Sequence, residues 1–384
     1  MRKRLGWVRG AFLMRFVRRD PLTHSNVLER LRSPLPLVGT VAEVAGFVNR
    51  CAITDSRWAM SSGLGFGDLA AERLRRETEL DRIASLLNWG PLNYRLEKHC
   101  RKLDGRPPFP PIVMFRALLL AQWYELSDRD LEEALCDRLS FRRFVGLGME
   151  QATPDHTTLC RFRERLNEAG LTVKLLALVN TQIEAKGLML KRGTLIDATV
   201  VETAAARPAR SDDPVTHVDS DAAFLKREGK SGSSYGYKAH VAVDEGSLLV
   251  RTAKLTPANV AETVVADELI IANSDGGAIY ADKAYDTHAR RDLLAKLGLK
   301  DGIMHRPNKH HALTHRQRRR NAALSKVRCS VETVFAVLKQ VYGYRRTRFV
   351  GLIRNQLQLT LLAICFNLRR MLVIASHARN PSPT

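Results

Sequence analysis

The sequence predicts an α+β fold, with a helical N-terminal domain followed by a mixed-sheet domain, and three observations support this prediction. The chain has 384 residues, 45% of them hydrophobic, which is enough for two or three domains with substantial cores. Helical periodicity extends from Leu80 to about Gly187. After Lys191 the pattern changes to short apolar runs that are separated by turn residues or by helical segments.

Residues 1–59 differ from the rest of the chain, since they are rich in arginine, poor in acid and without a sustained period. One interpretation is a basic upstream extension without fixed structure, or an over-long start of the reading frame. The other is a basic arm that binds DNA. A secretory signal is not expected, because arginines interrupt the stretch that follows the basic start at Arg2.

Residues 60–187 are assigned to a helical domain. An apolar run at 112–124 follows two prolines, which are common where a helix begins. Ser127 and Asp130 have the spacing of a capping box for the next helix. A later helix starts after Thr153 and ends before a glycine.

On that later helix, Leu159, Phe162 and Leu166 share one face, and Arg161 and Arg165 project from the opposite side. Several short helices with a basic exposed face suit a helix-turn-helix-like module that contacts DNA. The alternative is an ordinary helical domain with a solvated basic face. The net charge of +21 favours the DNA contact.

Residues 190–348 are assigned to the second domain. The segment 204–234 reads as a long mobile loop, and 245–247 as the turn of a hairpin. The element order β-β-β-α-β-α-β-α is the one expected of an RNase H-like mixed sheet. The predicted strands are 193–203, 237–244, 248–255, 278–282 and 302–305, and the predicted helices are 261–272, about 290–297 and about 326–342.

Residues 349–384 are expected to form a C-terminal helix and tail. The apolar run at 357–368 is too short for a membrane span and suits a buried helix. No lipidation motif is present, so we expect no membrane partner and a location in the cytoplasm, on DNA. The six cysteines form no C-x-x-C pair and are interpreted as reduced, mostly core residues.

Two aspartates occupy positions where aspartate is unusual. Asp197 lies inside the apolar strand LIDATVV, where an unpaired carboxylate would be costly or would have a raised pKa. A metal cation would remove that cost, and the alternatives are an edge position or a buried Asp–Arg pair. Asp282 ends the run AIYAD, and carboxylates at strand ends gather at the ligand-binding edge of open sheets. The nearby Asp286 could instead cap the next helix.

Glu332 lies on the predicted last helix, beside its buried stripe. Arg328, Lys339 and Arg346 fall on the same helix edge, so a carboxylate stands between cations. Taken alone, Arg328 and Glu332 read as an ordinary i,i+4 ion pair. Together with the two aspartates, however, Glu332 completes a set of three acids. Hard carboxylate oxygens suit Mg²⁺, and two such ions can support phosphodiester cleavage.

Six blocks of the sequence resemble DDE transposases of bacterial insertion sequences, closest to the IS-five family, from about Met60 to Arg348. In the helical domain they are RPPFPPIVMFRALLLAQWYELSDRDLEEAL and TPDHTTLCRFRERL. In the second domain they are LIDATVVE, YGYKAHVAVD, YADKAYD and RCSVETVFAVLK. Two positions depart from the family pattern, since Ser325 stands where a tyrosine is usual and Ala284 replaces a glycine.

The resemblance implies that Asp197, Asp282 and Glu332 are the catalytic, metal-binding triad, with two Mg²⁺ or Mn²⁺ ions as cofactors. It implies cleavage at the ends of an insertion sequence and joining of the 3′ ends to target DNA. The expected partners are double-stranded DNA and further copies of this chain, which form a homo-oligomer on DNA. The expected DNA-binding residues are Arg328, Lys339, Arg346, Arg161 and Arg165. The alternatives are a metal-dependent nuclease on the same fold and an inactive DNA-binding protein derived from a transposase.

Tyrosine and histidine side chains are less informative. Tyr237 alternates with apolar residues and is expected in the core, and His240 is expected to be a structural histidine. The histidines in the basic stretch 305–320 lie among arginines and lysines, which favours phosphate contact over metal binding.

Overall fold

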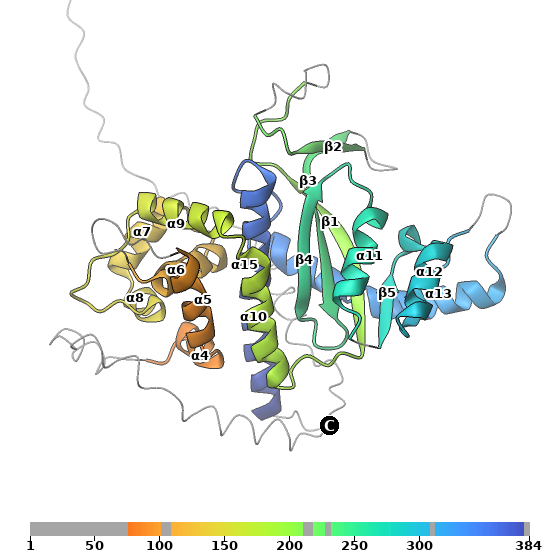
Figure 1. Ribbon diagram of the computed structural model, residues 1–384, viewed down its shortest axis with the longest axis horizontal. Coiled ribbons are helices and arrows are strands. Elements are labelled where there is room, and N and C mark those ends of the chain that lie inside the picture. The colour runs from red at the N-terminus through yellow and green to blue at the C-terminus, as the bar shows by residue number, and fades with distance from the viewer. Residues whose placement is uncertain are drawn as a thin grey trace, which may run out of the picture.

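The computed structural model describes residues 76–100, 109–209, 218–226, 232–275, 277–307 and 312–379, and the expectations for residues 1–59 lie outside these ranges. Figure 1 shows small helices at one end of the molecule and a sheet with its covering helices at the other. Two long helices, α10 and α15, stand between them (Figure 1).

The helical part confirms the predicted helices with small shifts of their ends. In α6 every residue except Arg116 is buried, so this helix forms the centre of the bundle. Ser127 and Asp130 form the predicted capping box. Asp155, rather than Thr153, caps the later helix. The helices are α4 (Glu79–Leu86), α5 (Gly90–Cys100), α6 (Pro111–Trp123), α7 (Asp128–Asp137), α8 (Leu139–Val145), α9 (His156–Glu168) and α10 (Thr172–Ala185).

The sheet has the RNase H-like arrangement that the element order predicted. Strands β1, β3 and β4 pair antiparallel, whereas β1, β5 and β6 pair parallel, so β1 is the central strand where the two halves meet. The predicted hairpin is present as β3 and β4. The strands are β1 (Gly193–Glu202), β2 (Ala223–Lys226), β3 (Ser233–Asp244), β4 (Val250–Pro257), β5 (Ala278–Ala281) and β6 (Lys300–Ile303).

Strand β2 corrects the expectation that residues 204–234 form only a loop. Its four residues pair with the first residues of β3, on the same edge as β4. None of the four is fully buried, so the segment has no apolar alternation by which a strand could be recognised in the sequence.

The helices of the second part are α11 (Glu262–Ala272), the 3₁₀ turn η3 (Lys283–Tyr285), α12 (His288–Lys296), α13 (His315–Arg328), α14 (Val331–Ala336), the π-helix η4 (Val337–Val341) and α15 (Leu352–Arg379). The single helix predicted at 326–342 is therefore wrong in its start and its continuity. Helix α13 begins inside the basic stretch, and a tightened turn at Cys329 separates it from α14. Because α13 buries no residue, it has no apolar period to reveal it.

Two hydrophobic clusters hold the molecule together. The larger one joins the helical part, one face of the sheet, α14 and α15. The smaller one lies between the other face of the sheet and α11 and α12. Neighbouring residues of β1 divide between them, since Leu195 belongs to the larger cluster and Ile196 to the smaller. The next residue, Asp197, therefore faces α14.

Helix α15 confirms the predicted buried C-terminal helix. It is long and apolar enough to cross a membrane, but 72% of its apolar window is buried within the protein, as in the core helix of a globular domain. The indole Nε1 of Trp123 donates to the Cys365 carbonyl oxygen at 3.1 Å. The cysteine expectation is wrong in part, because only Cys100 and Cys365 are buried among the five described cysteines.

Candidate active site

Asp197 and Asp282 are brought side by side by the parallel pairing of β1 with β5. Leu195 pairs with Tyr280 in this ladder. Continuing the register by two residues sets Asp197 opposite Asp282, on neighbouring strands about 4.8 Å apart. Asp282 lies directly after β5 and starts the η3 turn, where its Oδ1 accepts a hydrogen bond from Lys283 N at 2.6 Å. This extended register puts the two carboxylates next to each other, just beyond the parallel part of the sheet.

Asp197 lies in a buried, electrostatically unusual position. Its Oδ1 accepts from Ala198 N at 2.8 Å, and its Oδ2 accepts from Arg328 Nη1 at 2.8 Å. Burial nevertheless raises its pKa to about 6, and the nearby carboxylates Glu262 and Asp282 contribute to the rise. The hydrogen bond from Ala198 and the charge of Arg328 therefore do not compensate for the burial of this carboxylate.

Glu332 lies on α14 and is linked to Asp197 through Arg328. The Arg328 Nη2 atom lies 3.7 Å from Glu332 Oε1, and the Glu332 side chain is 65% exposed. The i,i+4 ion pair read from the sequence exists, but the shorter contact of Arg328 is with Asp197. The alternative of a buried Asp–Arg pair is likewise present in this geometry.

The donor set suits a divalent cation in its chemistry. All three acids offer hard oxygen ligands, and the pKa of Asp197 is raised mainly by burial, which disfavours the ionised carboxylate that a bound cation would stabilise. Within the described ranges, no three acidic, histidine or cysteine side chains are grouped closely enough to hold a metal ion. Metal binding by all three acids would therefore require Glu332 to turn toward the two aspartates.

Lys339 approaches β1 from the π-helix that follows α14. Its Nζ donates to Thr199 Oγ1 at 2.6 Å and to the Val200 carbonyl oxygen at 2.9 Å. A π-helix is rare and often occurs at functional sites. An open pocket of about 520 Å³ lies beside this contact, lined among others by Glu332, Lys339 and Arg345. The pocket lies along the second half of β1, and of the three acids only Glu332 lines it.

The other predicted DNA-binding arginines have different surroundings. Arg161 is exposed, as predicted, whereas Arg165 is half-buried and donates from Nη1 to the Cys100 carbonyl oxygen at 3.1 Å. The expectation that Arg165 projects freely is therefore wrong. Arg346 donates to three consecutive carbonyl oxygens after β1, those of Thr203, Ala204 and Ala205. These three bonds hold the end of β1 in place.

Three residues beside the acids were missed in the sequence analysis. Glu262 begins α11 and lies 3.7 Å from the buried Lys238 Nζ. The Tyr285 hydroxyl is buried without a hydrogen-bond partner among the described residues. Burial and the charges of Glu262, Asp197 and Asp282 all raise the Tyr285 pKa. Lys238 in an apolar strand was the one available signal, because a buried lysine requires an acidic partner.

The remaining candidates are structural. His240 Nε2 lies 2.9 Å from Thr256 Oγ1, and burial lowers the pKa of this imidazole to about 4, so it is neutral at pH 7. Tyr237 is buried in the core, as predicted. Asp286 accepts from Arg291 and from the Arg306 amide, and Thr287 caps α12 in its place.

Comparison with known proteins agrees with this geometry. A family model described as "Transposase DDE domain" matches residues 189–368, which include Asp197, Asp282 and Glu332. A second, described as "Transposase domain (DUF772)", matches residues 69–165 in the helical part. The solved structure "Crystal structure of a pre-cleavage Mos1 transpososome" aligns with 89% of this chain and 98% of its own, at 12% identity and a TM-score of 0.18, which is too low to support an argument. These two transposase domains, in this order, indicate a DDE transposase.

Proposed function

We propose that this chain is the transposase of an insertion sequence of the IS-five type. It binds the ends of the element, cleaves phosphodiester bonds there and joins the 3′ ends to target DNA. The observation that supports this most is the parallel pairing of β1 with β5, since Asp197 lies two residues beyond Leu195 and Asp282 two residues beyond its partner Tyr280, with α14 and its Glu332 against β1. That arrangement lies inside the matched DDE domain.

The three acids are the proposed ligands of two Mg²⁺ or Mn²⁺ ions. Such ions lower the pKa of an attacking water and stabilise the leaving oxygen. Asp197, Asp282 and Glu332 would together hold the two ions. Arg328 then exchanges its Asp197 contact for a DNA phosphate, which its planar guanidinium can bind with two hydrogen bonds.

The helical domain is the proposed reader of the element ends, with Arg161 as its exposed cation. Lys339 and Arg328 are proposed to hold the scissile strand at the acids. Arg346 contributes by holding the end of β1, through its bonds to the carbonyl oxygens that follow the strand. We further propose that the protein acts as a homo-oligomer on DNA, in the cytoplasm and on the nucleoid.

Substitution of the acids tests the metal-binding role directly. Asp197→Asn, Asp282→Asn and Glu332→Gln should each abolish strand cleavage in Mg²⁺ and largely spare DNA binding, since loss of one ligand disables a coupled site. The substrate is a duplex from the border of the element. Asp292→Asn, an exposed change on α12, is the matched control and should cleave normally. Near-normal cleavage by any one of the three variants would remove that residue from the site.

The products separate this function from its alternatives. Joined products beside cleaved ones are expected of a transposase. Cleavage without joining would indicate a nuclease, and binding without cleavage in Mg²⁺ or Mn²⁺ would indicate an inactive derivative. Calcium should support binding but not efficient cleavage, because it activates water poorly.

A further inference from the structure

Helix α13 presents a cationic outer face that the catalytic site does not use. At 100° per residue, its exposed residues fall within one arc of the helix. Four of them are the cations Arg316, Arg318, Arg319 and Lys326. The same arc carries two exposed alanines between these cations. Their small side chains allow a ligand to approach the helix backbone closely. The whole helix contains no acidic residue.

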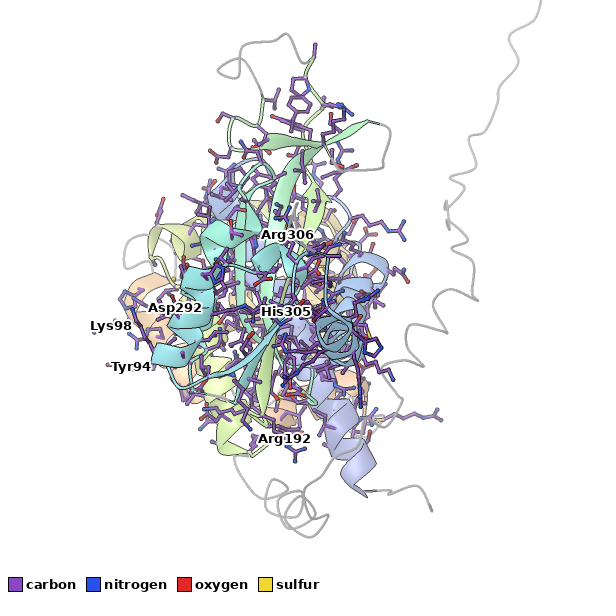
Figure 2. All side chains as sticks on the ribbon, turned by 90° about the vertical axis from the view of Figure 1, so that its right-hand side faces the viewer. Tyr94, Lys98, Arg192, Asp292, His305 and Arg306 are labelled. Atoms are coloured by element: carbon purple, nitrogen blue, oxygen red, sulfur yellow. The ribbon has the colours of Figure 1, made fainter. Side chains whose placement is uncertain are left out.

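The opposite face of α13 is fixed to the protein. Arg320 donates to the Ile303 carbonyl oxygen at 2.7 Å and to the Asp301 carbonyl oxygen at 2.6 Å. Asn321 exchanges hydrogen bonds with the backbone of His305, at 2.8 and 2.9 Å. Figure 2 shows His305 near the middle of the face that looks to the right in Figure 1. These contacts hold the helix in one position and leave its outer arc in solvent.

Among the described residues, the acids that contact α13 pair with its Arg320 or Arg328 and not with its four outer cations. Asp301 binds Arg291 and Arg320, and Asp286 binds Arg291. The four outer cations have no side-chain hydrogen bond or ion pair among the described residues. Their positive charges are therefore not offset within this part of the protein.

This charge pattern is unfavourable for the helix by itself. Arg316 and Arg318 lie in the first turn, where the helix dipole disfavours cations. Like charges three or four residues apart, such as Arg316 and Arg319, repel each other. A helix that buries no side chain gains little from packing to compensate. A polyanion bound along the outer arc would reverse each of these costs.

The position of α13 indicates which polyanion would bind along its outer arc. Its last residue, Arg328, contacts Asp197, so the helix leads away from the acids. From Arg328 back to Arg316 the helix covers about 18 Å, the length of roughly five base pairs. In Figure 1, α13 lies at the end of the molecule opposite to α4–α9. A duplex read by the helical domain and cut at the acids would continue over α13.

We propose that the outer face of α13 binds the backbone of the donor duplex just outside the cleavage point, independently of its sequence. This inference rests on the proposed function, because it assumes that the helical domain holds the element end. Arginine and lysine side chains at this spacing contact phosphates and carry no sequence information. The face therefore holds the flanking DNA in place while the strand is cut.

The test compares two triple variants that each lower the formal charge by three. Arg318→Ala/Arg319→Ala/Lys326→Ala removes three outer cations of α13, and alanine maintains the helix. The control, Lys98→Ala/Lys174→Ala/Lys296→Ala, removes three exposed cations from other helices. Binding is measured in EDTA, where no cutting occurs, as a function of salt. The probes are a border duplex with 20 base pairs of flank, the same duplex ending at the cleavage point, and an unrelated duplex of the longer length.

On the flanked duplex, the α13 variant should bind on the order of 100-fold more weakly at 0.1 M salt, with a salt slope smaller by about two to three. On the duplex without flank, it should match the control. An equal loss on both border duplexes, an unchanged slope, or a loss only when a separate target duplex is added would each overturn the assignment. If the natural protein binds border and unrelated duplexes alike, end recognition fails, but the slope difference between the triple variants remains measurable on the unrelated duplex.

Discussion

At Asp197 two opposing effects determine the charge of the site. Arg328 and the Ala198 amide stabilise the ionised carboxylate, whereas burial and two neighbouring acids destabilise it. Burial is the largest of these effects, and the pKa rises to about 6. A bound cation near Asp197 would stabilise the ionised carboxylate that burial disfavours.

The raised pKa of Asp197 predicts how stability depends on pH. The folded state binds this proton more tightly than the unfolded state, whose carboxyl has the ordinary value of 3.8. The free energy of unfolding should therefore fall as pH rises from about 4 to 6, by up to about 3 kcal/mol, and stay low above that range. Asp197→Asn should lack this fall, and Asp292→Asn should retain it. Urea unfolding at several pH values in EDTA measures it, and the same profile in Asp197→Asn and the natural protein would contradict the assignment.

Lys339 and Arg328 should affect mainly the chemical step. If they hold the scissile phosphate, Lys339→Ala and Arg328→Ala should cleave more slowly by about 100-fold or more, with a modest loss of DNA binding. Arg328→Ala should also lose stability, because it leaves Asp197 unpaired. Single-turnover cleavage at saturating protein is the measurement.

Two controls separate this role from a structural one. Thr199→Val removes the hydroxyl partner of Lys339 but keeps the cation, so its cleavage rate should stay near that of the natural protein. Lys296→Ala removes an exposed cation from α12 and should have no effect. A Thr199→Val rate as low as that of Lys339→Ala would show that Lys339 acts only by tying the π-helix to β1.

At the scale of elements, α9 and α13 show how differently two basic helices can be used. In α9, Arg163 pairs with Asp128, Arg165 bonds to a carbonyl oxygen, and only Arg161 is exposed. In α13 the outer cations are exposed together. Two of the three arginines of α9 are thus bound within the helical domain. Helix α13 has more exposed cations that could contact DNA.

Arg161 should make the cleaner test of DNA binding by the helical domain. Arg161→Ala should weaken binding of the border duplex and reduce the salt slope by about one. Adding Arg165→Ala should reduce the slope by up to about one more and cost about 1 kcal/mol of stability, because the Cys100 carbonyl oxygen loses its donor. Lys174→Ala on α10 is the control. An unchanged slope in the double variant would place the contact elsewhere on the domain.

At the scale of the whole molecule, α15 joins the two parts that the family models match separately. It packs against β4, α10 and α6, and its residues lie in the larger hydrophobic cluster with both parts. Asn367 of α15 also connects the two parts through hydrogen bonds. Its side chain bonds to the Val250 amide at 2.7 Å, the Val250 carbonyl oxygen at 2.8 Å and Asn180 Oδ1 at 2.9 Å.

Asn367→Ala should therefore destabilise the helical part and the sheet together. The change leaves the buried backbone groups of Val250 without their Asn367 partner, although Asn180 also donates to the Val250 carbonyl oxygen. We expect a loss of about 2–4 kcal/mol in the free energy of unfolding. Denaturant unfolding followed by tryptophan fluorescence, with the exposed Ser376→Ala as control, measures it. A loss below 0.5 kcal/mol, roughly the size of an ordinary surface change, would contradict the linking role.

The order of elements and the positions of the three acids could be predicted from the sequence. Asp197 and Asp282 were recognisable because an aspartate in or after an apolar run contradicts the burial pattern around it. Strand β2 and helix α13 were not predicted correctly, because neither buries a periodic set of side chains. The local pattern of apolar residues predicts an element only where one of its faces is buried. Strand β2 and helix α13 have almost no buried face.

The sequence by itself thus determined the fold class, the DDE resemblance and the acids, since each depends on residues close together in the chain. Only the tertiary structure decided that Arg328 binds Asp197, that Glu262 adds charge beside it, and that Arg165 and Arg346 bond to carbonyl oxygens. The physical reason is that desolvation and ion pairing depend on neighbours that lie 65 to 143 residues away in the chain. Those long-range contacts determine which cations are left exposed to bind DNA. The net charge of the sequence does not show which cations these are.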